Sequence, residues 1–125
     1  MAKTNKYNLN YIGGIDEYKK RTIYTLNIMD DGFSVDGLFK KKKFSYSQVV
    51  EIKYGEIDVL KETSDIVRML LFDQVALLDL RNNRKIKYCL MIQLKERTIL
   101  FAEQFDVSLK NAYANLLNKV NLANK

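Results

Sequence analysis

Apolar and polar side chains alternate in short runs along most of the chain. Residues 22–29 and 85–94 show this most clearly, and a two-residue period is typical of strands with one buried face. In the second run we expect Leu90 and its alternate neighbours to form the core face, and Cys89 and Met91 to lie on the face that meets solvent or a partner. Weaker patterns predict further strands at residues 33–35, 49–54, 57–60 and 98–101.

Turn residues separate these runs. Asp30 and Asp31 precede Gly32, and we expect this glycine to supply the positive φ that tight hairpin loops often need. The apolar segment at residues 66–80 has no clean period, so it fits either a helix or a strand. Further turns or loops are predicted at residues 36–37, 45–48 and 95–97.

Residues 106–122 have a helical period instead. Their apolar side chains recur at every third or fourth position, which forms a single stripe along a helix. Asp106 or Ser108 can cap the start of this helix by accepting a hydrogen bond from a free backbone N–H. The strands supply an apolar face that needs a cover, so we expect the helix to be structural. The stripe consists of Leu109, Ala112, Tyr113, Leu116, Leu117 and Val120.

These elements predict one domain over residues 1–125, in the mainly β (α+β) class. We expect a strongly bent sheet or partly open barrel of about seven antiparallel strands, capped by the C-terminal α-helix. A chain of 125 residues buries enough surface to fold without a disulfide or a metal. No apolar stretch reaches the ~20 residues that a membrane-spanning helix needs.

The residue types of common catalytic and metal sites are scarce. The chain has no histidine and one cysteine, Cys89, for which we expect a packed thiol. The adjacent carboxylates Asp30 and Asp31, or Asp16 and Glu17, fit solvated turns better than catalysis. We therefore expect a protein that is not an enzyme and holds no metal or cofactor. The single cysteine and the absence of a signal-peptide pattern in the first thirty residues favour a reducing, cytoplasmic location.

The net charge of +6 is unevenly distributed. Residues 1–53 carry +4 (ten basic, six acidic), residues 54–80 carry −4 (two basic, six acidic) and residues 81–125 carry +6 (nine basic, three acidic). Two basic arms therefore flank an acidic middle. On a strand, the four consecutive lysines would project two to each face, so one face of this segment must be wet. They indicate either a solvated edge strand that resists aggregation or an anion-binding patch. The candidate anion- or partner-binding residues are Lys19, Lys20, Arg21, Lys40, Lys41, Lys42, Lys43, Arg81, Arg84, Lys85 and Lys87.

Several short motifs follow one another along the chain, and their order can be compared with that of known domain families. Residues 11–14 read aromatic, aliphatic, Gly-Gly, and residues 22–33 hold a Thr-rich strand with an acidic-Gly turn. Residues 46–49 read aromatic, polar, polar, aliphatic. Residues 68–87 hold an Arg, a bulky apolar run, Ala-Leu-Leu and a basic stretch, and residues 88–94 form the strand before the helix. This order resembles the bacterial pleckstrin-homology-like (PH-like) domains over nearly the whole chain.

The resemblance implies a seven-stranded bent sheet or barrel with one open end plugged by the helix. Eukaryotic relatives bind phosphoinositides through basic residues around the first hairpin, and Lys19, Lys20 and Arg21 lie in the matching loop. We expect a binding module that engages a protein partner, which is either another protein or a second copy of this chain in a homo-oligomer. An adaptor at an anionic membrane surface is a further form of the same expectation. The alternative is sequence-independent binding of nucleic acid by the basic patches.

Overall fold

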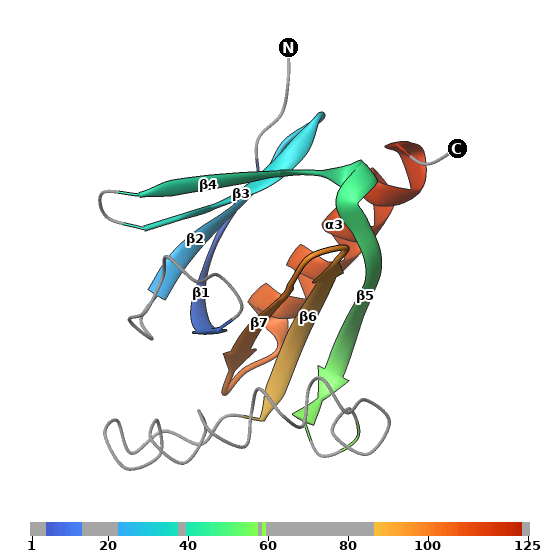
Figure 1. Ribbon diagram of the computed structural model, residues 1–125. Helices are drawn as coiled ribbons and strands as arrows, with labels where there is room; N and C mark the ends of the chain where they lie inside the picture. The colour runs from blue at the N-terminus through green and yellow to red at the C-terminus, as the bar shows by residue number, and fades with distance from the viewer. Residues whose placement is uncertain (1–4, 14–22, 38–39, 58, 60–86, 124–125) are drawn as a thin grey trace.

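The computed structural model describes residues 5–13, 23–37, 40–57, 59 and 87–123, which form one antiparallel sheet and one long helix (Figure 1). The mainly β class with a C-terminal helix is therefore confirmed. The strands are β1 (Asn5–Gly13), β2 (Ile23–Ile28), β3 (Gly32–Asp36), β4 (Lys41–Ser45), β5 (Val49–Glu56), β6 (Tyr88–Leu94) and β7 (Thr98–Glu103). The 3-10 helix η1 (Tyr46–Gln48) separates β4 from β5, and the helix α3 (Val107–Ala123) follows β7.

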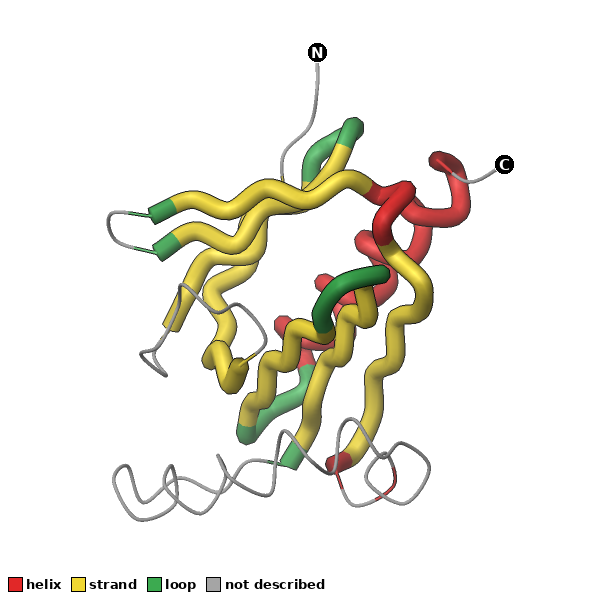
Figure 2. Tube along the Cα trace, viewed as in Figure 1, coloured by secondary structure: helices red, strands yellow, loops and turns green. Residues whose placement is uncertain are grey.

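The seven strands form a single sheet in the order β4-β3-β2-β1-β7-β6-β5. Strand β1 joins the two halves of this sheet. Residues 5–10 pair with β2, whereas Tyr11 and Gly13 pair with β7 across a shift in register. Such an irregularity bends a strand and increases its twist. The edge strands β4 and β5 are joined through η1 and diverge from there, which leaves the sheet bent and unclosed (Figures 1 and 2).

The inner face of the bent sheet carries the core. Direct cross-strand partners lie on the same face of a sheet. Leu26 opposite Val35 in one half, and Leu90 opposite Phe101 in the other, therefore extend apolar rows across neighbouring strands. All four side chains are fully buried. The alternation of residues along each strand thus becomes one continuous apolar surface, to which both halves of the sheet contribute.

Helix α3 covers this inner face and contacts strands of both halves. The predicted stripe is confirmed at its centre but is narrower than expected, because Tyr113 and Leu117 are only half-buried. Tyr113 stacks on Tyr54 of β5, with ring centroids 5.6 Å apart. Within the described residues, no helix has both the length and the apolar character needed to span a bilayer. The buried members of the stripe are Leu109, Ala112, Leu116 and Val120.

Polar side chains also hold α3 to the sheet. Asn115 donates a hydrogen bond from Nδ2 to the hydroxyl of Tyr7 on β1, at 3.2 Å. Lys119 lies 2.6 Å from a carboxylate oxygen of Asp30, in the turn between β2 and β3. The helix is therefore fixed at the β1–β2 half of the sheet by polar contacts as well as by burial.

Strand β6 departs from the expected pattern of one wet face. Cys89 and Met91, predicted to meet solvent or a partner, are buried at 0% and 1% exposure. Their cross-strand partners Ala102 and Leu100 are also fully buried. The expectation of a face that meets solvent or a partner is therefore wrong at these two positions, although Lys87 at the start of the same face is exposed. A two-residue period cannot show whether the second face of a strand is buried as well. The expected packing of the Cys89 thiol is confirmed.

Two local predictions are also corrected. The φ of Gly32 does not lie in the left-handed region; instead, a Cβ at this position would overlap the backbone carbonyl oxygen of Phe44 on β4. Glycine is needed there for close approach between strands. The strand predicted at residues 57–60 is wrong where it is described, since Ile57 and Val59 are helical. A run of four residues is too short to distinguish a strand period from a helical period. Residues 66–80 lie outside the described residues.

Candidate binding site

The structure places the lysine run at the edge of the sheet. Lys40 precedes β4, and the next three lysines form most of this strand, which is terminal in the strand order. The prediction that the lysine run lies on an edge strand is therefore confirmed. Lys19, Lys20, Arg21, Arg81, Arg84 and Lys85 lie outside the described residues.

The lysines of β4 point alternately to the two faces of the sheet. Lys42 lies opposite Val35, which is a core residue, and is half-buried on the inner face. Lys43 lies opposite Ser34 and shares the outer face with Lys41, and both of these lysines are exposed. The predicted alternation is confirmed, and it separates one inward lysine from two outward ones.

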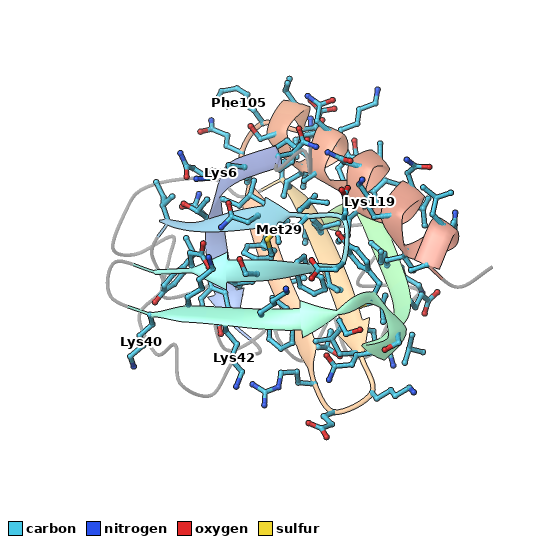
Figure 3. All side chains as sticks on the ribbon, turned by 90° about the horizontal axis from the view of Figure 1, so that it is seen from above. Lys6, Met29, Lys40, Lys42, Phe105 and Lys119 are labelled. Carbon is cyan, nitrogen blue, oxygen red and sulfur yellow. The ribbon has the colours of Figure 1, made fainter. Side chains whose placement is uncertain are left out.

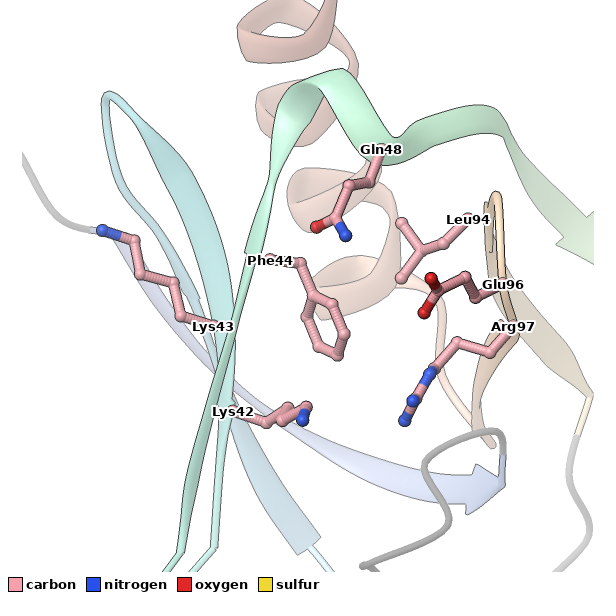
Figure 4. A pocket seen from close by; sticks show the side chains of 7 residues that line it. All are labelled: Lys42, Lys43, Phe44, Gln48, Leu94, Glu96 and Arg97. Carbon is pink, nitrogen blue, oxygen red and sulfur yellow. The ribbon is translucent and has the colours of Figure 1, made fainter.

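A small pocket of about 170 Å³ lies in the angle between β4 and the turn that joins β6 to β7 (Figure 4). Lys42 and Arg97 point into it from opposite sides, and the ring of Phe44 lies between them and η1 (Figure 4). The ammonium group of Lys43 points away from the pocket (Figure 4). The lining residues are Lys42, Lys43, Phe44, Gln48, Leu94, Glu96 and Arg97.

Backbone hydrogen bonds hold the walls of this pocket. The N–H of Leu94 donates to the carbonyl oxygen of Arg97 at 2.7 Å, which closes the β6–β7 turn. The N–H of Lys95 donates to the carbonyl oxygen of Gln48 at 3.0 Å and ties this turn to η1. Gln48 also accepts a hydrogen bond from the N–H of Ser45 at 2.9 Å, within a capping box. The site is thus organised before any ligand arrives, which lowers the entropic cost of binding.

Among the described lining residues, the charges favour an anion, because Lys42 and Arg97 are cationic and Glu96 carries one carboxylate. Lys43 is paired with the carboxylate of Asp31 at 2.9 Å, and this hydrogen bond lowers the pKa of Asp31 below its ordinary value of 3.8. An ammonium beside a guanidinium is suited to a carboxylate or a phosphate, because both give charge-assisted hydrogen bonds.

A row of polar residues crosses the outer face of the same half of the sheet. Lys6, Asn27, Ser34 and Lys43 lie opposite one another on β1, β2, β3 and β4. Asn27 and Ser34 are buried at the centre of the row, and Asn27 donates from Nδ2 to the Ser34 hydroxyl at 3.3 Å. The outer face at β4 is therefore polar and carries a lysine at each end of this row.

Lys87 does not belong to the pocket. It lies just before β6, with its ammonium 5.5 Å from the centre of the Tyr88 ring. Leu94, which lines the pocket, is at the other end of β6. At about 3.3 Å per residue, roughly 20 Å of strand separate the two ends. Of the candidate basic residues that the structure describes, Lys87 therefore lies apart from the lysines at β4.

Arg97 and Gln48 were not among the candidates chosen from the sequence. Arg97 belongs to the predicted polar turn at residues 95–97, so a basic residue in a hairpin turn was the available signal. Nothing in the local sequence connects this turn with β4, because the two segments are brought together by the bend of the sheet.

Within residues 5–13, 23–37, 40–57, 59 and 87–123, no group of three or more His, Cys, Asp or Glu side chains could hold a metal ion. Burial raises the pKa of the Cys89 thiol to about 12, which keeps this group protonated at neutral pH.

No family model, no curated protein and no solved structure matches this chain. The class of protein is defined by the fold and the site together: a bent, open antiparallel sheet with a C-terminal helix, and a cationic pocket beside one sheet edge.

Proposed function

We propose that this protein is a non-enzymatic, cytoplasmic binding module of PH-like type that engages a protein partner at β4 without a cofactor. One observation carries the proposal: Lys42 and Arg97, far apart in sequence, point into one pocket beside an edge strand (Figure 4). The bent, open sheet under a C-terminal helix supports the PH-like resemblance.

The size of the pocket favours part of a macromolecule over a free small molecule. Pockets for small ligands usually enclose roughly 300–1,000 Å³, whereas this pocket encloses about 170 Å³. That space suits a single charged side chain or a similar group. The remaining contacts of the partner would then be made on the surface around the pocket.

The positions of two aromatic residues favour a protein over nucleic acid. Proteins that bind single strands usually stack bases on aromatic rings beside a basic groove. Phe44, which lines the pocket, is only 5% exposed and stacks on Phe33 with centroids 5.2 Å apart. Phe105 is 73% exposed but lies near the start of α3, on the opposite side of the molecule from Lys40 and Lys42 (Figure 3). The exposed ring of Phe105 is therefore separated from the basic edge.

Binding of three probes at one salt concentration tests the proposal. The probes are a fluorescent acidic peptide, a single-stranded oligonucleotide and a vesicle containing phosphatidylserine. We expect the peptide to bind, and Lys42→Glu or Arg97→Glu to weaken it by about tenfold or more, because a like charge replaces a complementary one. The matched control is Lys95→Glu, which changes an exposed lysine of the same turn that does not line the pocket.

Two results would overturn the proposal. Binding of the oligonucleotide or the vesicle without the peptide would favour the nucleic-acid or the membrane-surface function. Equal losses for Lys42→Glu and Lys95→Glu would show that total charge, and not the pocket, determines binding. Thermal melting of each variant shows that it is folded.

A further inference from the structure

The face of α3 that points away from the sheet carries little charge. Within Val107–Ala123, Lys110 is the only charged residue that is exposed, and Lys119 is half-buried beside Asp30. Charged residues make up 29% of the whole chain, and the solvent face of an amphipathic helix usually holds many of them. Interfaces between proteins are instead depleted of charged residues at their centre. The outer face of α3 therefore has the composition of a contact surface.

A row of exposed residues runs along the middle of this face. Its members recur at intervals of three or four residues, which places them on one side of the helix. Successive residues are about 100° apart around a helix, so this row lies opposite the buried members of the stripe. We call it the outer row, and it consists of Val107, Asn111, Ala114, Asn118 and Leu122.

Apolar side chains mark the two ends of the outer row. Val107 at the start of the helix and Leu122 near its end are both more than half exposed. The exposed Phe105 lies two residues before Val107 and adds apolar surface at that end. These three are half of the six large apolar side chains that are exposed among the described residues. Single exposed apolar residues need no explanation, but their concentration on one helix indicates an interaction surface.

We propose that a second copy of this chain packs on the outer row, with the two α3 helices antiparallel about a two-fold axis near Ala114. Val107 lies seven residues before Ala114, and Leu122 lies eight residues after it. Antiparallel packing therefore sets Val107 of each copy beside Leu122 of the other. By the same count it sets Asn111 beside Asn118, and their amides can exchange hydrogen bonds. The outer row is thus self-complementary, as a two-fold interface requires.

Charge and size favour this face and predict a weak dimer. A net charge of +6 makes two copies repel each other, but the outer row has no charged member to bring together. Ala114 at its centre lets the helix axes approach to about 8 Å. A helix of 17 residues is about 25 Å long and presents a face roughly 10 Å wide, or about 250 Å². Stable interfaces bury about 800 Å² per partner, so we expect half-association only at about 0.1–1 mM.

Sedimentation of the full chain from about 10 μM to about 1 mM is the first test. Ala114→Glu should weaken association at least about tenfold, because it sets two carboxylates beside each other at the axis. Val50→Glu makes the same change of charge at an exposed position of β5 and should leave association within about twofold. Thermal melting shows that each variant is folded. A chain that stays monomeric at the highest concentration, or equal losses for the two variants, would overturn the inference and leave the pocket at β4 unaffected.

Disulfide cross-linking tests the antiparallel register. Under a mild oxidant, Ala114→Cys should form a linked dimer, because the two copies of this residue meet near the axis. Val107→Cys alone should not, because its two copies lie about 20 Å apart at opposite ends of the contact. A mixture of Val107→Cys and Leu122→Cys should give the mixed dimer. The natural thiol of Cys89 is buried and takes no part. Linkage of Val107→Cys as fast as that of Ala114→Cys, or no linkage of any variant, would overturn the inference.

Discussion

The carboxylate of Glu103 on β7 accepts two hydrogen bonds from Asn10 on β1, one from the backbone N–H at 3.1 Å and one from Nδ2 at 2.8 Å. Asn10 is the last residue of β1 in register with β2, and pairing with β7 begins at Tyr11. One side chain therefore secures the point at which β1 passes from one half of the sheet to the other.

Removing this carboxylate should destabilise the sheet. We expect Glu103→Ala to lower the free energy of unfolding by about 1–3 kcal/mol, because the partly buried N–H of Asn10 loses its acceptor. Glu103→Gln keeps one oxygen as an acceptor and should cost less. Urea denaturation measures both values. A loss below about 0.5 kcal/mol in Glu103→Ala, the usual effect of a surface substitution, would contradict this role.

Gly32 should tolerate a side chain poorly. A Cβ there would overlap the backbone carbonyl oxygen of Phe44, which cannot move without shifting β4. We expect Gly32→Ala to cost about 1–3 kcal/mol, as overpacking does. The control is Gly37→Ala, whose Cβ would meet the ring of Tyr24, a side chain that can shift. Thermal melting should show the larger loss for Gly32→Ala, and equal melting temperatures would contradict the close approach of β3 and β4.

Tyr46 should make stability depend on pH in the alkaline range. Its hydroxyl donates to the carbonyl oxygen of Met29. Burial, followed by the charges of Asp31 and Asp30, raises the pKa of Tyr46 from 10.0 to about 12. The folded state thus holds the phenol proton more tightly than the unfolded chain. This contribution to stability is fully present below pH 10 and is lost as the pH rises through about 12.

The variant Tyr46→Phe measures this contribution. Phenylalanine does not titrate. The stability advantage of the natural protein over Tyr46→Phe should therefore shrink as the pH rises from the ordinary tyrosine pKa of 10.0 to the folded-state pKa of about 12. Chemical denaturation at a series of pH values measures the advantage. A constant difference across that interval would show that the pKa of Tyr46 is the same in the folded and unfolded states.

The thiol of Cys89 should not react while the protein is folded. Its exposure is 0%, and burial raises its pKa to about 12. We expect a thiol reagent at neutral pH to modify Cys89 only at the rate of unfolding, with full modification in denaturant. Val50→Cys supplies the control, because Val50 is 59% exposed and a thiol there should react at once. Immediate modification of folded protein at Cys89 would contradict the burial of this face of β6.

Much of the fold follows from short-range sequence patterns. The alternation in residues 22–29 predicted β2, the polar residues 95–97 predicted the β6–β7 turn, and the stripe in residues 106–122 predicted α3. Each of these elements is encoded by residues within a few positions of one another. The predictions that were wrong at Gly32 and Cys89 concern contacts between distant segments, because their neighbours are supplied by other strands. The strand predicted at residues 57–60 was wrong for a local reason, since four residues are too few to define a period.

The lysine run could be recognised as an edge-strand candidate from the residues alone, and so could the alternation of its lysines between two faces, because the pleat of a strand fixes the direction of each side chain. The shared pocket of Lys42 and Arg97 became evident only from the folded arrangement. That contact depends on the bend of the sheet at β1 and on η1, which together place β4 across from the β6–β7 turn. No local pattern contains this arrangement, because it results from the packing of the whole sheet.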